Sequence, residues 1–218
     1  MFMKKLIGYI LWGIVVLLAI NLIAIAVPYF SFKKDYDFLL VKQDMLHNLT
    51  WVIAFYVHLL GGIISVFTGL ILYFTKWIKP SSKLHKIIGK IYFISILFFA
   101  GPTGLYLGFY SEAGYVASIG FIGMSLAWMI PTFMMVYTIT KGNIEGHYKW
   151  SIRSYAITLA GVTLRIMTPL GIHFLQWDYD TTFTITAYLP WMINWGIAEV
   201  VILTKRHRMS EIVKLGLK

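Results

Sequence analysis

The sequence predicts an all-α integral membrane protein with six transmembrane helices, and three observations lead to this fold class. Of the 218 residues, 59% are hydrophobic and only 13% are charged, whereas a soluble domain carries about 25% charged residues. Apolar runs of the roughly 20 residues that a spanning helix needs recur along the chain. The basic residues lie mostly in short connectors between these runs, as the orientation signals of membrane proteins do.

The apolar runs define six expected spans in a single transmembrane domain that covers residues 1–218. The spans are 6–29, 49–74, 84–109, 115–140, 152–175 and 185–204. The first run follows MFMKK and resembles a secretion signal, but it exceeds the roughly 7–15 residues of a signal core, so we expect an uncleaved helix. Tryptophans stand near several expected ends, where aromatic belts form: Trp51, Trp77, Trp150 and Trp177.

Lysine and arginine are divided unequally between the two ends of the spans. One side collects Lys4, Lys5, Lys76, Lys79, Lys83, Lys86, Lys90, Lys141, Lys149, Arg153, Lys205, Arg206, Arg208, Lys214 and Lys218. The other side has Lys33, Lys34 and Lys42, with Asp35, Asp37, Asp44, Glu112, Asp178 and Asp180. Because positive residues stay cytoplasmic, we expect both termini in the cytoplasm and a multi-pass protein of the cell (plasma or inner) membrane.

Composition also limits the chemistry of the chain. It contains no cysteine, which excludes disulfides, thiolate metal sites, iron–sulfur clusters and covalently attached c-type haem. A bound metal would therefore need histidine nitrogen or carboxylate oxygen. The formal net charge of +10 would suggest nucleic acid for a soluble protein. Here the basic residues sit at membrane edges, so the expected partner is the lipid bilayer and not nucleic acid.

Three polar side chains are expected at similar depth in the outer half of the membrane. At about 1.5 Å per residue, Asn21 lies roughly 22 Å from the inner end of its span, Arg165 roughly 20 Å and His58 roughly 24 Å. An arginine at such depth costs a few kcal/mol or more and normally faces the bundle interior with a partner. Either Asn21 and His58 merely satisfy Arg165, or the three residues line a functional site.

A second polar group is expected at the inner face. His85 opens span 3 in SSKLHKIIGKIYF, and His147 stands just before span 5. The two histidines share a depth, as two ligands of one metal must. Arg153 begins span 5 and Glu199 lies about a turn inside span 6, so an ion pair is geometrically possible, and we interpret such a pair as a structural salt bridge.

Two histidines are followed by glycine one helical turn later, His58 in HLLGG and His85 in HKIIG. Such a glycine either lets two helices pack closely or leaves room for a haem macrocycle beside an axial imidazole. His85 and His147 could form an inner pair. His58 has only His173 as a candidate partner, although their depths differ, at roughly 13 Å and 3 Å from the outer ends of their spans. Arg165 could neutralise a haem propionate or a quinone-like headgroup.

Four stretches carry a family resemblance: VHLLGGIISVFTGLILYF, LHKIIGKIYFISILFFAGPTGLYLGFY, GHYKWSIRSYAITLAGVTLRI and AYLPWMINWGIAEVVI. Together they resemble a bacterial family of predicted membrane proteins, domain of unknown function 2306, over residues 49–204. The motif positions of that family fall on His58, Leu84, His85, Gly89, Tyr92, His147, Trp150, Arg153, Ser154, Arg165, Asn194 and Glu199. Lys86 and Lys90 replace the usual arginines, and Ser151 replaces methionine. The resemblance implies the architecture and supplies no activity.

The chain is also loosely similar to two-haem b-type cytochromes of the ascorbate-reducible kind. They have six helices and histidines followed by glycine four residues later, and the likeness implies a four-helix core from helices 2–5 that carries the haem ligands. In this chain the fourth helix, YVASIGFIGMSLAWMIPTFMMVYTIT, contains no histidine. One haem is therefore better supported than two.

Three hypotheses are compatible with these residues. The leading one is membrane electron transfer, with haem b on His85 and His147, and with His58 and Arg165 at a second metal, redox or quinone site; a redox protein or quinone would be the partner. The second is a small-solute or proton-coupled transporter with a midplane site at His58, Arg165 and Asn21. The third is a non-catalytic membrane subunit that binds a partner or lipid. No hydrolase, phosphate-loop or His-Glu-x-x-His motif is present, and enzyme activity is left open.

Overall fold

The computed structural model describes the backbone of residues 2–74 and 82–214 and the side chains of residues 13–72 and 82–204. Within these ranges every regular element is helical, and six helices are long and apolar enough to cross a membrane. The predicted all-α fold with six spans is confirmed. Part of the predicted charge and tryptophan pattern lies outside the described side chains: Lys4, Lys5, Lys76, Trp77, Lys79, Lys205, Arg206, Arg208, Lys214 and Lys218.

The spans are built from regular α-helix with short tighter or wider helical segments. The elements are α1 (Phe2–Ala26), η1 (Val27–Ser31), η2 (Asp37–His47), α2 (Leu49–Phe74), α3 (Lys83–Ile94), η3 (Ser95–Ala100), α4 (Gly101–Gly108), α5 (Gly114–Thr140), α6 (Ile144–Thr158), α7 (Ala160–Pro169), η4 (Leu170–Phe174) and α8 (Tyr179–Lys214). Segments η1 and η2 are 3-10 helices, and η3 and η4 are π-helices. Span 3 therefore consists of α3, η3 and α4, and span 5 consists of α6, α7 and η4.

Spans 5 and 6 begin earlier than their hydropathy predicts, at Ile144 and Tyr179 rather than at residues 152 and 185. The cause is capping, which satisfies the free N–H groups of a helix start with a side-chain oxygen. Asn143 Oδ1 accepts the backbone N–H of Gly146 at 2.7 Å, and Asp178 Oδ1 accepts that of Thr181 at 2.8 Å. The backbone N–H and hydroxyl of Thr181 also hold the pKa of Asp178 below its usual value.

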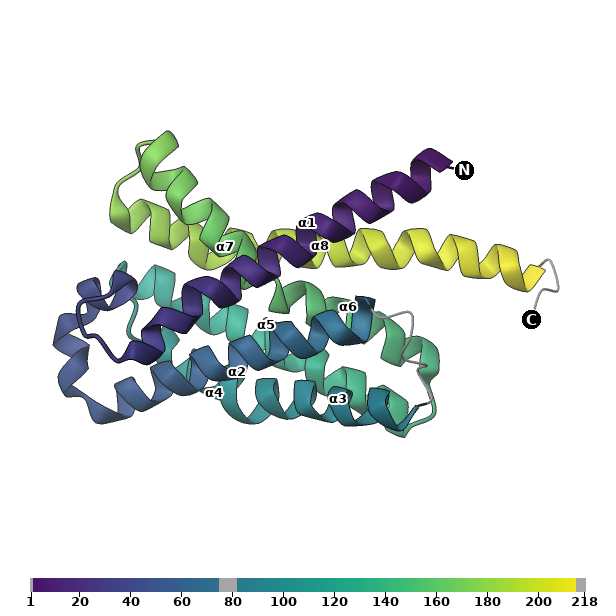
Figure 1. Ribbon diagram of the computed structural model, residues 1–218, viewed down its shortest axis with the longest axis horizontal. Helices are drawn as coiled ribbons and strands as arrows, with labels where there is room; N and C mark the ends of the chain where they lie inside the picture. Colours follow the sequence, from purple (N-terminus) through teal and green to yellow (C-terminus); the bar gives the residue numbers. More distant parts are fainter. Residues whose placement is uncertain (1, 75–81, 215–218) are drawn as a thin grey trace.

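Spans 2–5 form the centre of the bundle, with α2 beside α3 and α4, α4 beside α5, and α5 beside α6. Helix α8 packs against α5, α6 and α7, and α1 crosses α2 and α7. Figure 1 shows the start of α1 and the end of α8 at the same end of the molecule, with η2 at the opposite end. An even number of spans requires this arrangement.

The two ends of the bundle differ in charge as the sequence indicates. The starts of α3 and α6 and the chain ends share one end, which carries Lys83, Lys86, Lys90, Lys141 and Lys149. We call this the inner end, following the positive-inside rule. The outer end holds η1, η2 and the connectors after α4 and η4.

One close contact inside the core depends on a glycine. Gly69 of α2 faces the ring of Tyr155 on α6, and a Cβ added at Gly69 would overlap Cε2 and Cδ2 of that ring. Tyr155 is 5% exposed, so its ring has little space into which to move. Glycine therefore sets the distance between α2 and α6, as small residues do at helix contacts in membranes.

We predict that Gly69→Ala destabilises the protein by about 1–3 kcal/mol, because overpacking forces the α2–α6 contact apart. Gly196→Ala on α8 is the matched control, since a Cβ there would meet no atom within 4 Å. Thermal unfolding in detergent should show a lower midpoint for Gly69→Ala and an unchanged or higher one for Gly196→Ala. Equal midpoints would contradict the close contact.

Candidate functional site

A buried network of hydroxyl groups joins three spans in the core. The Tyr92 hydroxyl on α3 lies 2.8 Å from Ser154 Oγ and 2.8 Å from Thr158 Oγ1, both on α6. Ser154 Oγ also lies 2.7 Å from Thr132 Oγ1 of α5, and the Trp128 indole N–H donates to Thr158 Oγ1 at 2.9 Å. Tyr92 is 2% exposed and Ser154 is 0% exposed. The network thus fixes how α3, α5 and α6 are rotated against one another.

The two inner histidines occupy equivalent positions below this network. His85 precedes Tyr92 on α3, and His147 precedes Ser154 on α6, each by about two helical turns or about 10 Å. Residues about two turns apart share a helix face, so both imidazoles belong to the faces that meet at Tyr92 and Ser154. The spacing therefore places both histidines about two turns from the hydroxyl network, each on the helix face that carries a member of it.

Local contacts hold each histidine in place. Ser82 Oγ accepts the backbone N–H of His85 at 3.1 Å and so caps α3, which begins at Lys83. His147 Nδ1 lies 2.7 Å from the carbonyl oxygen of Met135 on α5. Because a carbonyl only accepts, Nδ1 carries the proton and donates it, which leaves Nε2 as the unprotonated nitrogen of the neutral ring.

No atom crowds the position one turn after His85 on α3. A Cβ at Gly89, one turn after His85, would meet no atom within 4 Å. The opposite face of α3 is the exposed one, formed by Leu84, Ile87, Ile91 and Ile94. On α6 the corresponding position between His147 and Ser154 is Ser151, whose hydroxyl donates to the His147 carbonyl at 2.6 Å. On both helices, the position one turn after the histidine therefore carries a small residue, Gly89 on α3 and Ser151 on α6.

The donor set of this inner site consists of two imidazoles. In the described part of the chain, no three histidine or acidic side chains lie together as ligands of a metal ion. Two imidazoles are the axial set for an iron whose remaining ligands come from a macrocycle. Of the nearby acids, Glu145 already pairs with Lys149 at 2.5 Å.

The ion pair that the sequence allows between Arg153 and Glu199 is present. Arg153 Nε and Nη2 donate to the two carboxylate oxygens of Glu199 at 2.6 Å and 2.9 Å, and the guanidinium stacks on the Trp150 ring at 4.5 Å. Asn194, 7% exposed, accepts from the Thr163 hydroxyl at 2.9 Å and donates to the Ala156 carbonyl at 2.8 Å. These two polar contacts attach α8 to span 5 and have a structural role.

His58 lies in a closely packed part of the core. Its Nδ1–H donates to the Ala100 carbonyl at 2.8 Å, and its ring meets Trp128 edge-on with centroids 6.4 Å apart. A Cβ at Gly104 would come within 2.8 Å of His58 Cε1. Ala100 ends the π-helix η3, and Pro102 follows, so the regular helical bonding is interrupted beside this histidine. The Gly104 face of His58 offers no space for a flat group.

The polar layer expected at Asn21, His58 and Arg165 does not form, since no hydrogen bond or ion pair joins these three described residues. Arg165 Nη1 lies instead 3.7 Å from Asp37 Oδ2, which also accepts the Tyr29 hydroxyl at 2.6 Å. Asn21 is exposed on α1. Asp37 lies in the outer connector between spans 1 and 2, where its backbone adopts a positive φ of 44°. The depth of Arg165 within its span does not reveal a partner that comes from a connector.

His173, the proposed outer partner of His58, is exposed in η4. Its exposed setting contrasts with the packed environment of His58. Sequence reasoning also missed the hydroxyl network as a unit, although Tyr92 and Ser154 belong to the motif positions. The available signal was the spacing of Ser154 and Thr158 by one turn on the face that carries His147.

Comparison with known proteins supports the architecture. A family model described as predicted membrane protein (DUF2306) matches residues 55–202, which extend from α2 into α8. No curated protein and no solved structure matches the chain. The family resemblance read from the sequence is confirmed, while the likeness to two-haem cytochromes stays a prediction.

We predict that Tyr92→Phe lowers the stability of the protein by about 1–3 kcal/mol, because the hydroxyls of Ser154 and Thr158 each lose a buried partner. Tyr137→Phe is the control, since Tyr137 is 46% exposed on α5 and should change stability by less than about 0.5 kcal/mol. Denaturant unfolding in detergent measures both. A Tyr92→Phe variant as stable as the control would mean that the network does not hold α3 to α6.

Proposed function

The chain belongs to the family of predicted membrane proteins DUF2306, which supplies no activity, and we propose from the inner histidines that it binds one b-type haem on His85 and His147 and serves in membrane electron transfer. The proposal concerns the inner histidines alone. The outer residues His58, His173 and Arg165 are not part of it.

The orientation of His147 carries this proposal. Metal-ligating histidines commonly donate the other ring N–H to a backbone carbonyl, which fixes the tautomer and turns the free nitrogen toward the metal. His147 makes this contact with Met135, and its Nε2 is left for a ligand. His85 lies on the face of α3 that carries Tyr92 two turns further on, and His147 lies on the face of α6 that carries Ser154. Tyr92 and Ser154 are in contact.

Two features near the histidines support the proposal. A Cβ at Gly89, one turn after His85, would meet no atom within 4 Å, and a macrocycle beside an axial imidazole needs such a missing side chain. Lys83, Lys86 and Lys90 lie on the same helix at the membrane edge and would favour the propionate groups of a haem. The hydroxyl network above the site is already satisfied internally, so it stays in place whether or not a ligand is present.

Haem iron, when bound, supplies one-electron exchange, and its potential depends on axial ligands and burial. His85 and His147 would hold the iron through their imidazole nitrogens, the Met135 carbonyl holds the His147 ring, and Tyr92 keeps α3 and α6 at a constant separation. A single site is favoured because the His58 ring is packed against Gly104 and Trp128 and His173 is exposed.

We predict that protein purified from haem-replete cells shows a Soret band that shifts on reduction. His85→Ala and His147→Ala should each lower haem content about tenfold or more, because an axial ligand is lost. His173→Ala, which changes an exposed histidine at the outer end, should leave the spectrum unchanged. The readout is haem per polypeptide by pyridine haemochrome absorbance, with thermal unfolding as a check that each variant folds. A colourless wild-type protein would refute the proposal.

A further inference from the structure

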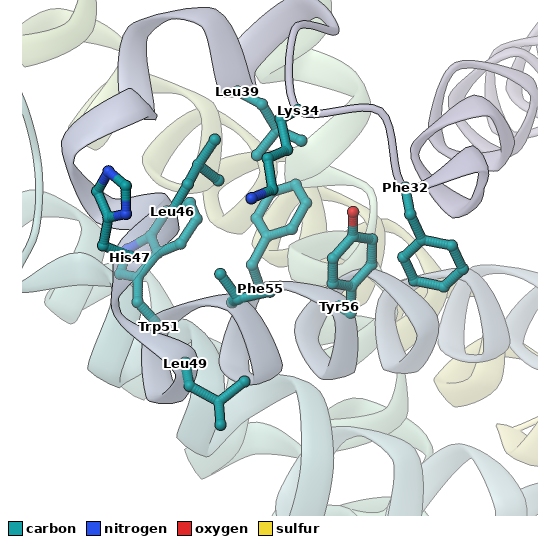
Figure 2. Close-up of a pocket in the computed structure, with 10 residues that line it drawn as sticks. Phe32, Lys34, Leu39, Leu46, His47, Leu49, Trp51, Phe55 and Tyr56 are labelled. Atoms are coloured by element: carbon teal, nitrogen blue, oxygen red, sulfur yellow. The ribbon is translucent and has the colours of Figure 1, made fainter.

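A pocket of about 300 Å³ lies at the outer end, far along the bundle from the inner histidines. It is a partly open pocket bordered by the connector after η1, by η2 above and by the first turns of α2 below (Figure 2). The pocket is lined by Phe32, Lys34, Leu39, Leu46, His47, Leu49, Trp51, Val52, Phe55 and Tyr56. Its volume lies at the lower end of the range of small-molecule sites.

The walls of the pocket are formed largely by aromatic rings that pack against one another. Trp51 and Phe55 stack with their ring centroids 5.4 Å apart, and Phe32 lies 5.0 Å from the Tyr56 ring. Trp51 and Leu39 are 1% and 2% exposed, so this side of the pocket belongs to a core cluster of the outer end. The pocket is therefore formed before any ligand enters, and it offers an apolar molecule flat surfaces.

No acidic residue lines the pocket, and three of its polar groups are hydrogen-bond donors. Figure 2 shows the Lys34 ammonium group directed into the space between Leu46, Phe55 and Tyr56. The Trp51 indole N–H is buried and has no hydrogen-bond partner, which is unusual for a buried donor. The Lys34 ammonium and the Tyr56 hydroxyl thus give the lining a cation and a donor, and the unpartnered Trp51 N–H is a further donor in its wall; this set suits a negatively charged acceptor.

Two acidic residues at this end, Asp37 and Glu112, are already engaged. Asp37 accepts the Tyr29 hydroxyl and faces Arg165, and Glu112 accepts Lys42 Nζ at 2.7 Å. Lys42 itself is 3% exposed and also donates to the Tyr110 carbonyl. Among the described residues Lys34 forms no ion pair, and Asp35 and Asp44 do not line the pocket, so no carboxylate balances the charge of Lys34 within the lining.

We propose that this pocket binds an anionic amphiphile, with a phosphate or carboxylate head at Lys34 and Trp51 and an apolar body between Phe55 and Tyr56. Trp51 lies in the first turn of span 2, at the level where aromatic residues meet lipid headgroups. The same chemistry is offered by an anionic lipid of the outer leaflet and by a free fatty acid. The inference is independent of the haem proposal, since it uses none of the inner residues.

Binding is tested with delipidated full-length protein in a neutral detergent. Phosphatidylglycerol, phosphatidylcholine and oleate are added separately, and the shift of the unfolding midpoint gives the affinity of each. We expect the wild-type protein to bind phosphatidylglycerol or oleate at least tenfold more tightly than phosphatidylcholine. Phosphatidylglycerol alone identifies a lipid as the source and oleate alone a free amphiphile; either result, or binding of both, supports the proposal.

Two variants locate the binding. Lys34→Ala should weaken binding about tenfold, which is the effect of one charge-assisted hydrogen bond. Lys33→Ala is the control, because it removes the same charge one residue away, outside the pocket lining. The control should leave binding unchanged. Trp51→Phe keeps a ring but removes the N–H, and it should weaken binding further. Because Lys34 is exposed, its variant folds even if the Trp51 variant does not. Equal affinity of the Lys34 and Lys33 variants, or no preference for anionic heads, overturns the proposal.

Discussion

A polar side chain in the hydrocarbon core of a bilayer has no water to bond with, so each one must find its partner inside the protein. The structure meets this constraint along span 5. Ser154 and Thr158 share the Tyr92 hydroxyl, Arg153 pairs with Glu199, and Thr163 donates to Asn194. The first contact joins span 5 to α3 and the other two join it to α8, and together they fix the rotation of these helices against span 5.

The position of the candidate haem site follows from this arrangement. His147 lies on the face of α6 that carries Ser154, and His85 lies on the face of α3 that carries Tyr92. The hydroxyl network therefore sets the separation and the rotation of both histidines, although it contacts neither ring. A change at Tyr92 would reach the site through helix placement, and a shift of the α5 backbone at Met135 would reach it through the orientation of the His147 ring.

The outer end is organised by charge rather than by hydroxyl groups. Arg165 rises from the core toward Asp37 in the outer connector, and Lys42 folds back onto Glu112. Both contacts draw η1 and η2 over the ends of the spans, where these segments cover the aromatic cluster around Trp51 and Phe55. The pocket at Lys34 exists because η1 and η2 lie above the first turns of α2 without filling the space between them.

The sequence by itself determined the six spans, the unequal charge of the two ends and the presence of costly polar residues at depth, because these depend on local composition and on the length needed to cross a bilayer. It also allowed the Arg153–Glu199 pair. The starts of spans 5 and 6 at Ile144 and Tyr179 were not predicted, because hydropathy does not detect the helix caps at Asn143 and Asp178. Only the tertiary structure decided that Arg165 meets Asp37 rather than Asn21 or His58, and that a pocket forms beneath η2. The reason is physical: depth along a helix follows from residue number, whereas a partner depends on how each helix is rotated and which distant segment packs against it.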